Sequence, residues 1–104
     1  MRKLLLPLTA AALLASPAGV GAAGKTVRVD DDFFSPKTMT VSKGTTVTWK
    51  WVGSSPHNVV SSGAARFSSK IQRTGTYKRT LRKAGTYRIV CTIHAGMKQT
   101  IKVR

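Results

Sequence analysis

Residues 85–97 of this 104-residue chain read GTYRIVCTIHAGM. The run from Tyr87 to Cys91 has the aromatic and β-branched composition and the period of two that are typical of a half-buried strand. A Gly precedes this run, and Cys91, His94 and Met97 then recur at intervals of three. The stretch therefore predicts a strand that leads into a loop carrying metal-binding side chains.

Short extended runs of the same kind extend outward from this stretch over the rest of the chain. They are rich in Val, Thr, Tyr and Trp, and turn-forming Gly, Pro and Ser separate them; the runs are 27–29, 39–41, 47–51, 57–60, 77–81 and 100–103. No stretch after residue 23 keeps a helical period for three turns. The pattern predicts an all-β domain, a sandwich or small barrel of about seven or eight strands. Residues 61–70 are the least regular and are expected to form a loop or a short helical turn.

The Cys, His and Met side chains form a donor set that suits copper. Thiolate and thioether sulfur with imidazole nitrogen match a trigonal His₂Cys site with a weak axial Met. The second imidazole has one candidate, His57, which lies 34 residues before Cys91. Taken singly, Cys91 or Met97 would more often be a buried apolar residue, and His57 a surface residue. Three ligand types within seven residues, together with one spare His upstream, favour a metal site.

The N-terminal segment has the layout of a secretory signal peptide. Arg2 and Lys3 precede an apolar stretch over residues 4–14, and small residues follow through residue 23. The apolar stretch is shorter than the about 20 residues that a membrane span needs. We expect a signal peptide over 1–23 and a copper-binding domain over 24–104, exported to a periplasm, the cell surface or the extracellular space. The alternative, a buried N-terminal helix, is opposed by the Pro and Gly residues at the end of the segment.

The charge is strongly basic. The chain has 18 Lys and Arg residues against 3 acidic ones, and loss of Arg2 and Lys3 would leave 16 against 3, a net charge of +13. Such a field attracts acidic partners, and it favours a monomer. We expect an acidic redox protein as partner, with electrostatic contact to an anionic membrane or wall surface as a further interaction. The basic residues are spread along the chain, which does not indicate specific nucleic-acid binding.

The remaining polar and aromatic features are expected to be structural. All three acidic residues are consecutive, Asp30 to Asp32, and a solvent-exposed turn is a better prediction for them than a calcium site. Trp49 and Trp51 alternate with polar residues and should lie in the core rather than form a base-stacking platform. One Cys excludes an internal disulfide, so a bound metal is one of the few stabilisers left to a domain this small.

The motifs resemble one family. GTYRIVCTIHAGM is similar to the ligand loop of plastocyanin- and amicyanin-type cupredoxins, and residues 33–51 and 56–60 resemble the first half of the same proteins. The resemblance implies a Greek-key β-sandwich and one type 1 (blue) copper ion. It places His57, Cys91, His94 and Met97 at the ligand positions and implies an electron carrier rather than an enzyme.

The resemblance also carries expectations for the surroundings of the metal. Asn58 stands where the family uses a backbone contact to fix the Cys loop, and His94 is expected nearest the surface as the electron exit. Two residues separate His94 from Met97, the short spacing of amicyanin. Val90 replaces the Tyr of plastocyanins, and Ile93 replaces the usual Pro.

Two other functions compete with electron transfer. An exported copper carrier or store could use the same four ligands. An OB-like or cold-shock-like nucleic-acid module fits the charge, but the signal peptide and the absence of clustered aromatic residues oppose it. An oxidase or reductase is poorly supported because a second, catalytic copper would need more imidazoles and both His residues are already assigned.

Overall fold

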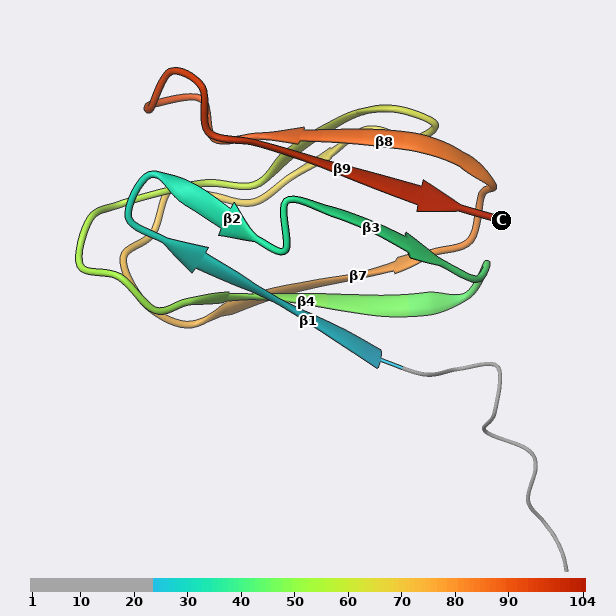
Figure 1. Cartoon of the computed structure of the whole chain (residues 1–104). Helices are drawn as coiled ribbons and strands as arrows, with labels where there is room; N and C mark the ends of the chain where they lie inside the picture. The colour runs from blue at the N-terminus through green and yellow to red at the C-terminus, as the bar shows by residue number, and fades with distance from the viewer. Residues whose placement is uncertain (1–23) are drawn as a thin grey trace, which may run out of the picture.

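The chain is a two-layered β-sandwich (Figure 1). The computed structural model describes residues 24–104, so the predicted signal peptide, 1–23, lies outside the described residues. The prediction of an all-β sandwich is confirmed. The strands are β1 (Gly24–Asp30), β2 (Phe33–Ser35), β3 (Thr38–Val41), β4 (Thr45–Trp51), β5 (Val60–Gly63), β6 (Phe67–Ser68), β7 (Thr76–Leu81), β8 (Gly85–Val90) and β9 (Lys98–Val103).

One sheet has the strand order β2-β1-β4-β7 and the other β3-β9-β8-β5-β6. Strand β1 runs parallel to β4, and β3 runs parallel to β9, whereas the other neighbours are antiparallel. Parallel strands end at the same edge of a sheet. The turn after β1 and the loop after β4 therefore leave the sheet side by side, with Val29 paired to Trp51 near their ends.

The core lies between the two sheets and follows the alternation of each strand. In β4 the side chains of Val47, Trp49 and Trp51 are buried, while Lys50 is exposed. The prediction that both Trp side chains lie in the core is confirmed. The indole Nε1 of Trp49 donates a hydrogen bond of 3.0 Å to the amide oxygen of Gln99 in the facing sheet, so this buried polar pair joins the two layers.

Residues 24–104 form nine strands, slightly more than the seven or eight expected. Strands β2 and β6 have three and two residues, which is too short to show a period in sequence. The irregular stretch 61–70 contains no helical turn. It includes most of a β5–β6 hairpin in which Ser61 pairs with Phe67. Strand β5 also pairs along its whole length with β8, and this pairing keeps the segment extended. Residues 24–104 include no helix long and apolar enough to cross a membrane.

Candidate metal centre

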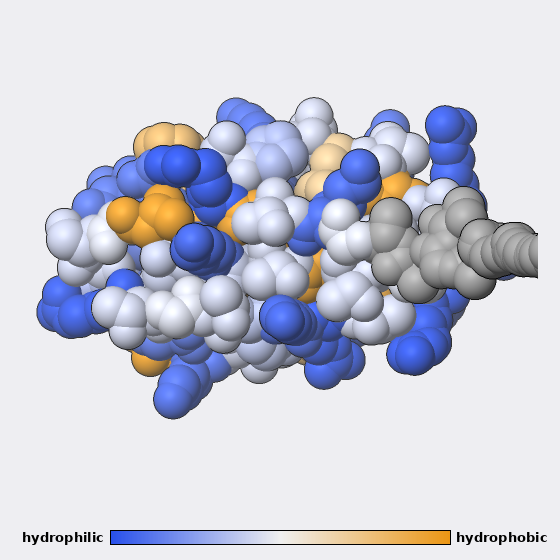
Figure 2. Space-filling view, turned by 90° about the horizontal axis from the view of Figure 1, so that it is seen from below, coloured by the Kyte–Doolittle hydropathy of each residue, from blue (hydrophilic) through white to orange (hydrophobic). Residues whose placement is uncertain are grey.

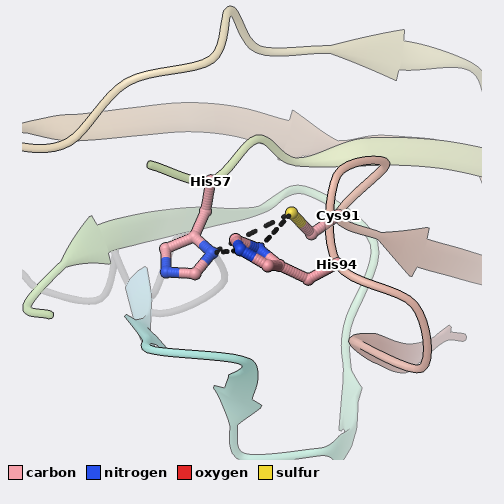
Figure 3. Close-up of side chains that lie close together, drawn as sticks. All are labelled: His57, Cys91 and His94. Atoms are coloured by element: carbon pink, nitrogen blue, oxygen red, sulfur yellow. Dashed lines mark hydrogen bonds between the residues drawn. The ribbon is translucent and has the colours of Figure 1, made fainter. Parts of the chain in front are cut away.

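Three potential ligand atoms converge at one end of the sandwich, between the two layers (Figure 3). The Nδ1 atoms of His57 and His94 lie 3.1 Å apart. The Sγ atom of Cys91 lies 3.9 Å from Nδ1 of His57 and 3.5 Å from Nδ1 of His94. Within residues 24–104 this is the one group of three His, Cys, Asp or Glu side chains close enough together to hold a metal ion.

Each of these side chains is positioned by the end of a strand. Cys91 follows β8 directly, and His94 lies in the turn between β8 and β9. His57 lies in the connection from β4 to β5, where its N–H and carbonyl both pair with the backbone of Gln72 at 3.0 Å. The Nε1 atom of Trp51 donates to the carbonyl of His57 at 3.1 Å. The backbone of His57 is therefore held by hydrogen bonds to both Gln72 and Trp51.

The loop from Cys91 to Met97 is closed by its own backbone. The N–H of Cys91 donates to the carbonyl of Met97 at 3.0 Å, and the N–H of Met97 donates to the carbonyl of His94 at 3.3 Å. Gly96 has a φ of +82°, a conformation that glycine adopts without steric cost. The turn returns the chain to β9 and leaves the Met97 side chain 1% exposed. The fourth predicted ligand residue is therefore buried at the end of the same loop.

Asn58 ties the His57 segment to the ligand loop. Its side-chain oxygen accepts a hydrogen bond of 2.8 Å from the N–H of Thr92, and its amide nitrogen donates to the hydroxyl of Thr92 at 2.9 Å. The resemblance implied a backbone contact at this position. The contact to the loop is instead made by the buried side chain of Asn58, and two hydrogen bonds hold it in one orientation.

The two imidazoles differ in exposure. His57 is fully buried, and Cys91 is 4% exposed. The His94 side chain is 29% exposed. As expected, His94 lies nearer the surface, so an approaching molecule meets its ring first.

Two acidic side chains, which the sequence predicted only as part of an exposed turn, contact the imidazoles. An Asp31 carboxylate oxygen lies 3.1 Å from Nε2 of His57, and one of Asp32 lies 3.6 Å from Nε2 of His94. Hydrogen bonds from the backbone of Ser54 and Ser55, with a further one from His57, hold the pKa of Asp31 well below its ordinary value. Asp31 is therefore ionised at neutral pH. In the sequence, three consecutive acidic residues in a basic chain are a visible signal. Their contacts with the two imidazoles are not visible there, because those contacts depend on the fold.

The geometry fits a single first-row metal ion. Such ions lie about 2.0–2.3 Å from nitrogen and sulfur ligands, so two ligands of one ion are at most about 4.6 Å apart. The three separations, 3.1, 3.5 and 3.9 Å, all meet this condition. Two imidazole nitrogens with a thiolate sulfur form the equatorial set that copper takes in electron-transfer sites.

Comparisons with known proteins agree with this geometry. Residues 25–104 match the model of the family described as copper binding proteins, plastocyanin/azurin family. A halocyanin from Natronomonas pharaonis is 39% identical over 66 residues, which are 59% of this chain and 40% of that protein. This chain therefore spans less than half the length of that relative.

Solved structures are similar across most of the described chain. An amicyanin structure has 27% identity and a TM-score of 0.66 over 78% of this chain and 82% of its own. The oxidised plastocyanin of Dryopteris crassirhizoma has 26% identity and a TM-score of 0.66 over 77% of this chain and 100% of its own. A copper-containing nitrite reductase from Thermus scotoductus SA-01 has 28% identity and a TM-score of 0.70, over 86% of this chain but 25% of its own. The match over residues 25–104 and the converging His, Cys and His side chains show that this chain belongs to the copper-binding plastocyanin/azurin family.

Proposed function

We propose that this protein is an exported type 1 copper protein that carries single electrons between redox proteins. The convergence of His57, Cys91 and His94 within 4.8 Å, beside a buried Met97 in the same loop, is the observation that carries the proposal. When bound, copper supplies the one-electron Cu(II)/Cu(I) couple. His57, Cys91 and His94 would hold the copper ion, with Met97 as the fourth ligand residue.

The surroundings of the ligands suit electron transfer because they resist movement. The His57 backbone is paired with Gln72, and the Asn58 side chain holds Thr92 beside the Cys91 position. Ligands that keep one arrangement in both redox states need little reorganisation at each transfer. Burial of Cys91 also protects its sulfur from solvent oxidants.

The partly exposed ring of His94 is the proposed route for electrons. Ile93 beside it is 42% exposed, and Ala95 and Gly96 on its other side are exposed as well. This small apolar surface can be desolvated when a redox partner docks. The +13 charge of residues 24–104 supports an acidic partner and a monomeric carrier.

Export is part of the proposal. The signal-peptide pattern of residues 1–23 supports it, with domain 24–104 as the mature protein in a periplasm or outside the cell. The leading alternative is an exported copper carrier or store with the same ligands.

The first test is addition of Cu(II) to the purified protein. A thiolate-bound type 1 site gives an intense blue absorption band, and Cys91→Ser should abolish this band because serine offers no thiolate. Met97→Leu should keep the band but shift the reduction potential, since the axial ligand tunes it. Met39→Leu, on β3, is the matched control and should change neither. A wild-type protein that binds Cu(II) without a blue band would contradict the proposal.

A second measurement separates an electron carrier from a copper carrier. The copper-loaded protein is mixed with a redox reagent and, separately, with a competing copper chelator. An electron carrier exchanges electrons over many cycles and retains its metal. Rapid loss of copper to the chelator with slow electron exchange would favour the carrier or storage function.

A further inference from the structure

The ring of His57 has both nitrogens engaged although it is completely buried. Its Nδ1 atom faces Cys91 and His94, and its Nε2 atom lies 3.1 Å from a carboxylate oxygen of Asp31. Both oxygens of Asp31 accept hydrogen bonds from N–H or O–H donors of Ser54 and Ser55, so the carboxylate acts as an acceptor and Nε2 is the donor of this hydrogen bond. An imidazole whose one N–H is at Nε2 has no hydrogen on Nδ1, and this is the form that can bind a metal through Nδ1.

The carboxylate of Asp31 is itself fixed in place. Both of its oxygens lie 3.1 Å from the backbone nitrogen of Ser54, one also accepts from the N–H of Ser55 at 2.9 Å, and the other accepts from the Ser54 hydroxyl at 3.2 Å. A Cβ added at Gly53 would lie 2.3 Å from an Asp31 oxygen. The loop after β4 thus holds this carboxylate beside His57 by hydrogen bonds, with Gly53 packed against one side of it and the other side exposed to solvent.

This arrangement follows from the parallel pairing of β1 with β4. Asp31 comes directly after β1, and Gly53 to Ser55 follow β4 after one intervening residue, so both segments leave the same edge of the sheet. His57 lies two residues after Ser55 in the same loop. Its backbone is held by Gln72 and its ring by Asp31.

We infer that Asp31 is a positioning residue of the metal centre, whose carboxylate fixes His57 as the Nε2–H tautomer and aims Nδ1 at the metal before the metal arrives. The predicted effect on copper binding rests on the proposed function, whereas the hydrogen bond between Asp31 and His57 does not. Hydrogen bonds of this kind set the orientation and the tautomer of metal-binding histidines. The site is therefore asymmetric, with His57 preorganised and His94 less constrained.

Asp32 provides the matched control. It also lies beside an imidazole, but its oxygen is 3.6 Å from Nε2 of His94, which is too long for a hydrogen bond, and its side chain is 70% exposed. Asp31→Ala and Asp32→Ala each remove one negative charge close to the metal site. Only Asp31→Ala removes the hydrogen-bond acceptor of a buried imidazole.

The test is nitrogen NMR of the two histidines in the metal-free protein at neutral pH, followed by copper titration. Wild-type His57 should be the Nε2–H tautomer. Asp31→Ala should give a mixture of tautomers and weaken copper binding by roughly 10- to 100-fold, whereas Asp32→Ala should leave the His57 tautomer and the copper affinity as in the wild type. Asp31→Asn is the conservative variant. Its amide oxygen still accepts from Nε2, so it should keep the tautomer and most of the affinity.

Three outcomes would overturn the inference: an Nδ1–H tautomer of His57 in the wild type, an unchanged tautomer and affinity in Asp31→Ala, or an equal loss of affinity in Asp32→Ala. The wild-type measurement decides the point even if Asp31→Ala does not fold. The proposed function fails separately, if the wild type gives no blue copper site, and the tautomer measurement still reports on Asp31 and His57 in that case.

Discussion

Gly63 and Gly44 both have a left-handed backbone but differ in their surroundings. Their φ angles are +91° and +89°. A Cβ added at Gly63 would lie 2.3 Å from the carbonyl oxygen of Thr86, whereas one added at Gly44 would meet nothing within 4 Å. The pair therefore separates the cost of the backbone conformation from the cost of a steric clash.

Gly44→Ala should lower the free energy of unfolding by about 1–2 kcal/mol, the cost of a left-handed conformation for a residue with a Cβ. Gly63→Ala should lower it by a further ~1–3 kcal/mol, because β5 must shift away from β8 to admit the methyl group. Urea unfolding of the metal-free proteins measures both values. Equal losses in the two variants would mean that the close approach to Thr86 is relieved without cost.

At the residue scale, the sequence predicts the ligands better than their supports. Cys91, His94 and Met97 are close in sequence and chemically distinctive, and His57 is the one other His in the chain. Asp31 could not be assigned to His57 in this way. Their contact depends on the parallel register of β1 and β4, which no local pattern encodes.

At the element scale, β4 and β9 are joined by one buried polar pair between the sheets. Gln99 is 1% exposed, accepts from Trp49 at 3.0 Å and donates to the carbonyl of Pro36 at 2.8 Å. This amide therefore connects β4, β9 and the segment between β2 and β3. The alternation of β4 predicted a buried Trp49, but no local pattern pointed to its hydrogen-bond partner 50 residues away.

Gln99→Leu should lower the free energy of unfolding by about 1–3 kcal/mol, because the indole N–H of Trp49 loses its buried acceptor. Adding Trp49→Phe removes that donor and should cost less in the Gln99→Leu background than in the wild type. A double-mutant cycle by urea unfolding measures this coupling. Additive losses would show that the hydrogen bond contributes nothing beyond packing.

Element lengths explain where strand prediction from sequence was incomplete. The seven-residue β4 shows a clear period of two, whereas the two-residue β6 cannot show any period. Strand β6 exists because Phe67 and Ser68 find backbone partners on β5. Pairing of this kind is a tertiary property, so residues 61–70 were expected to be irregular.

At the scale of the whole molecule, the charge is uneven. Residues 24–104 carry 16 basic and 3 acidic residues. The face seen in Figure 2 is mostly of intermediate hydropathy with many hydrophilic residues and separate apolar areas. The three acidic residues are consecutive, and two of them lie beside the imidazoles of the metal centre. The molecule thus has a strongly positive long-range field and a local acidic corner near the proposed electron exit.

Electron exchange with one small anion and one small cation tests whether the overall positive charge or the local acidic corner controls the encounter with a redox partner. With the anion hexacyanoferrate the rate constant should fall as salt is added, because steering of about 10- to 1000-fold is screened. With the cation hexaammineruthenium it should rise. Stopped-flow measurement over a range of ionic strength gives both slopes. The reverse pair of slopes would mean that the acidic corner dominates and that the natural partner is basic.

The direction of the first and last strands has a practical consequence for attachment. Strand β1 starts, and β9 ends, at the end of the sandwich remote from the Cys91–Met97 loop, a distance of about 20 Å for strands of six or seven residues (Figure 1). A tether joined before Gly24 or after Arg104 would therefore hold the protein at the end of the sandwich opposite the metal centre. Fixed in this way to a membrane, a second domain or an electrode, the molecule would still present His94 outward to whatever exchanges electrons with it.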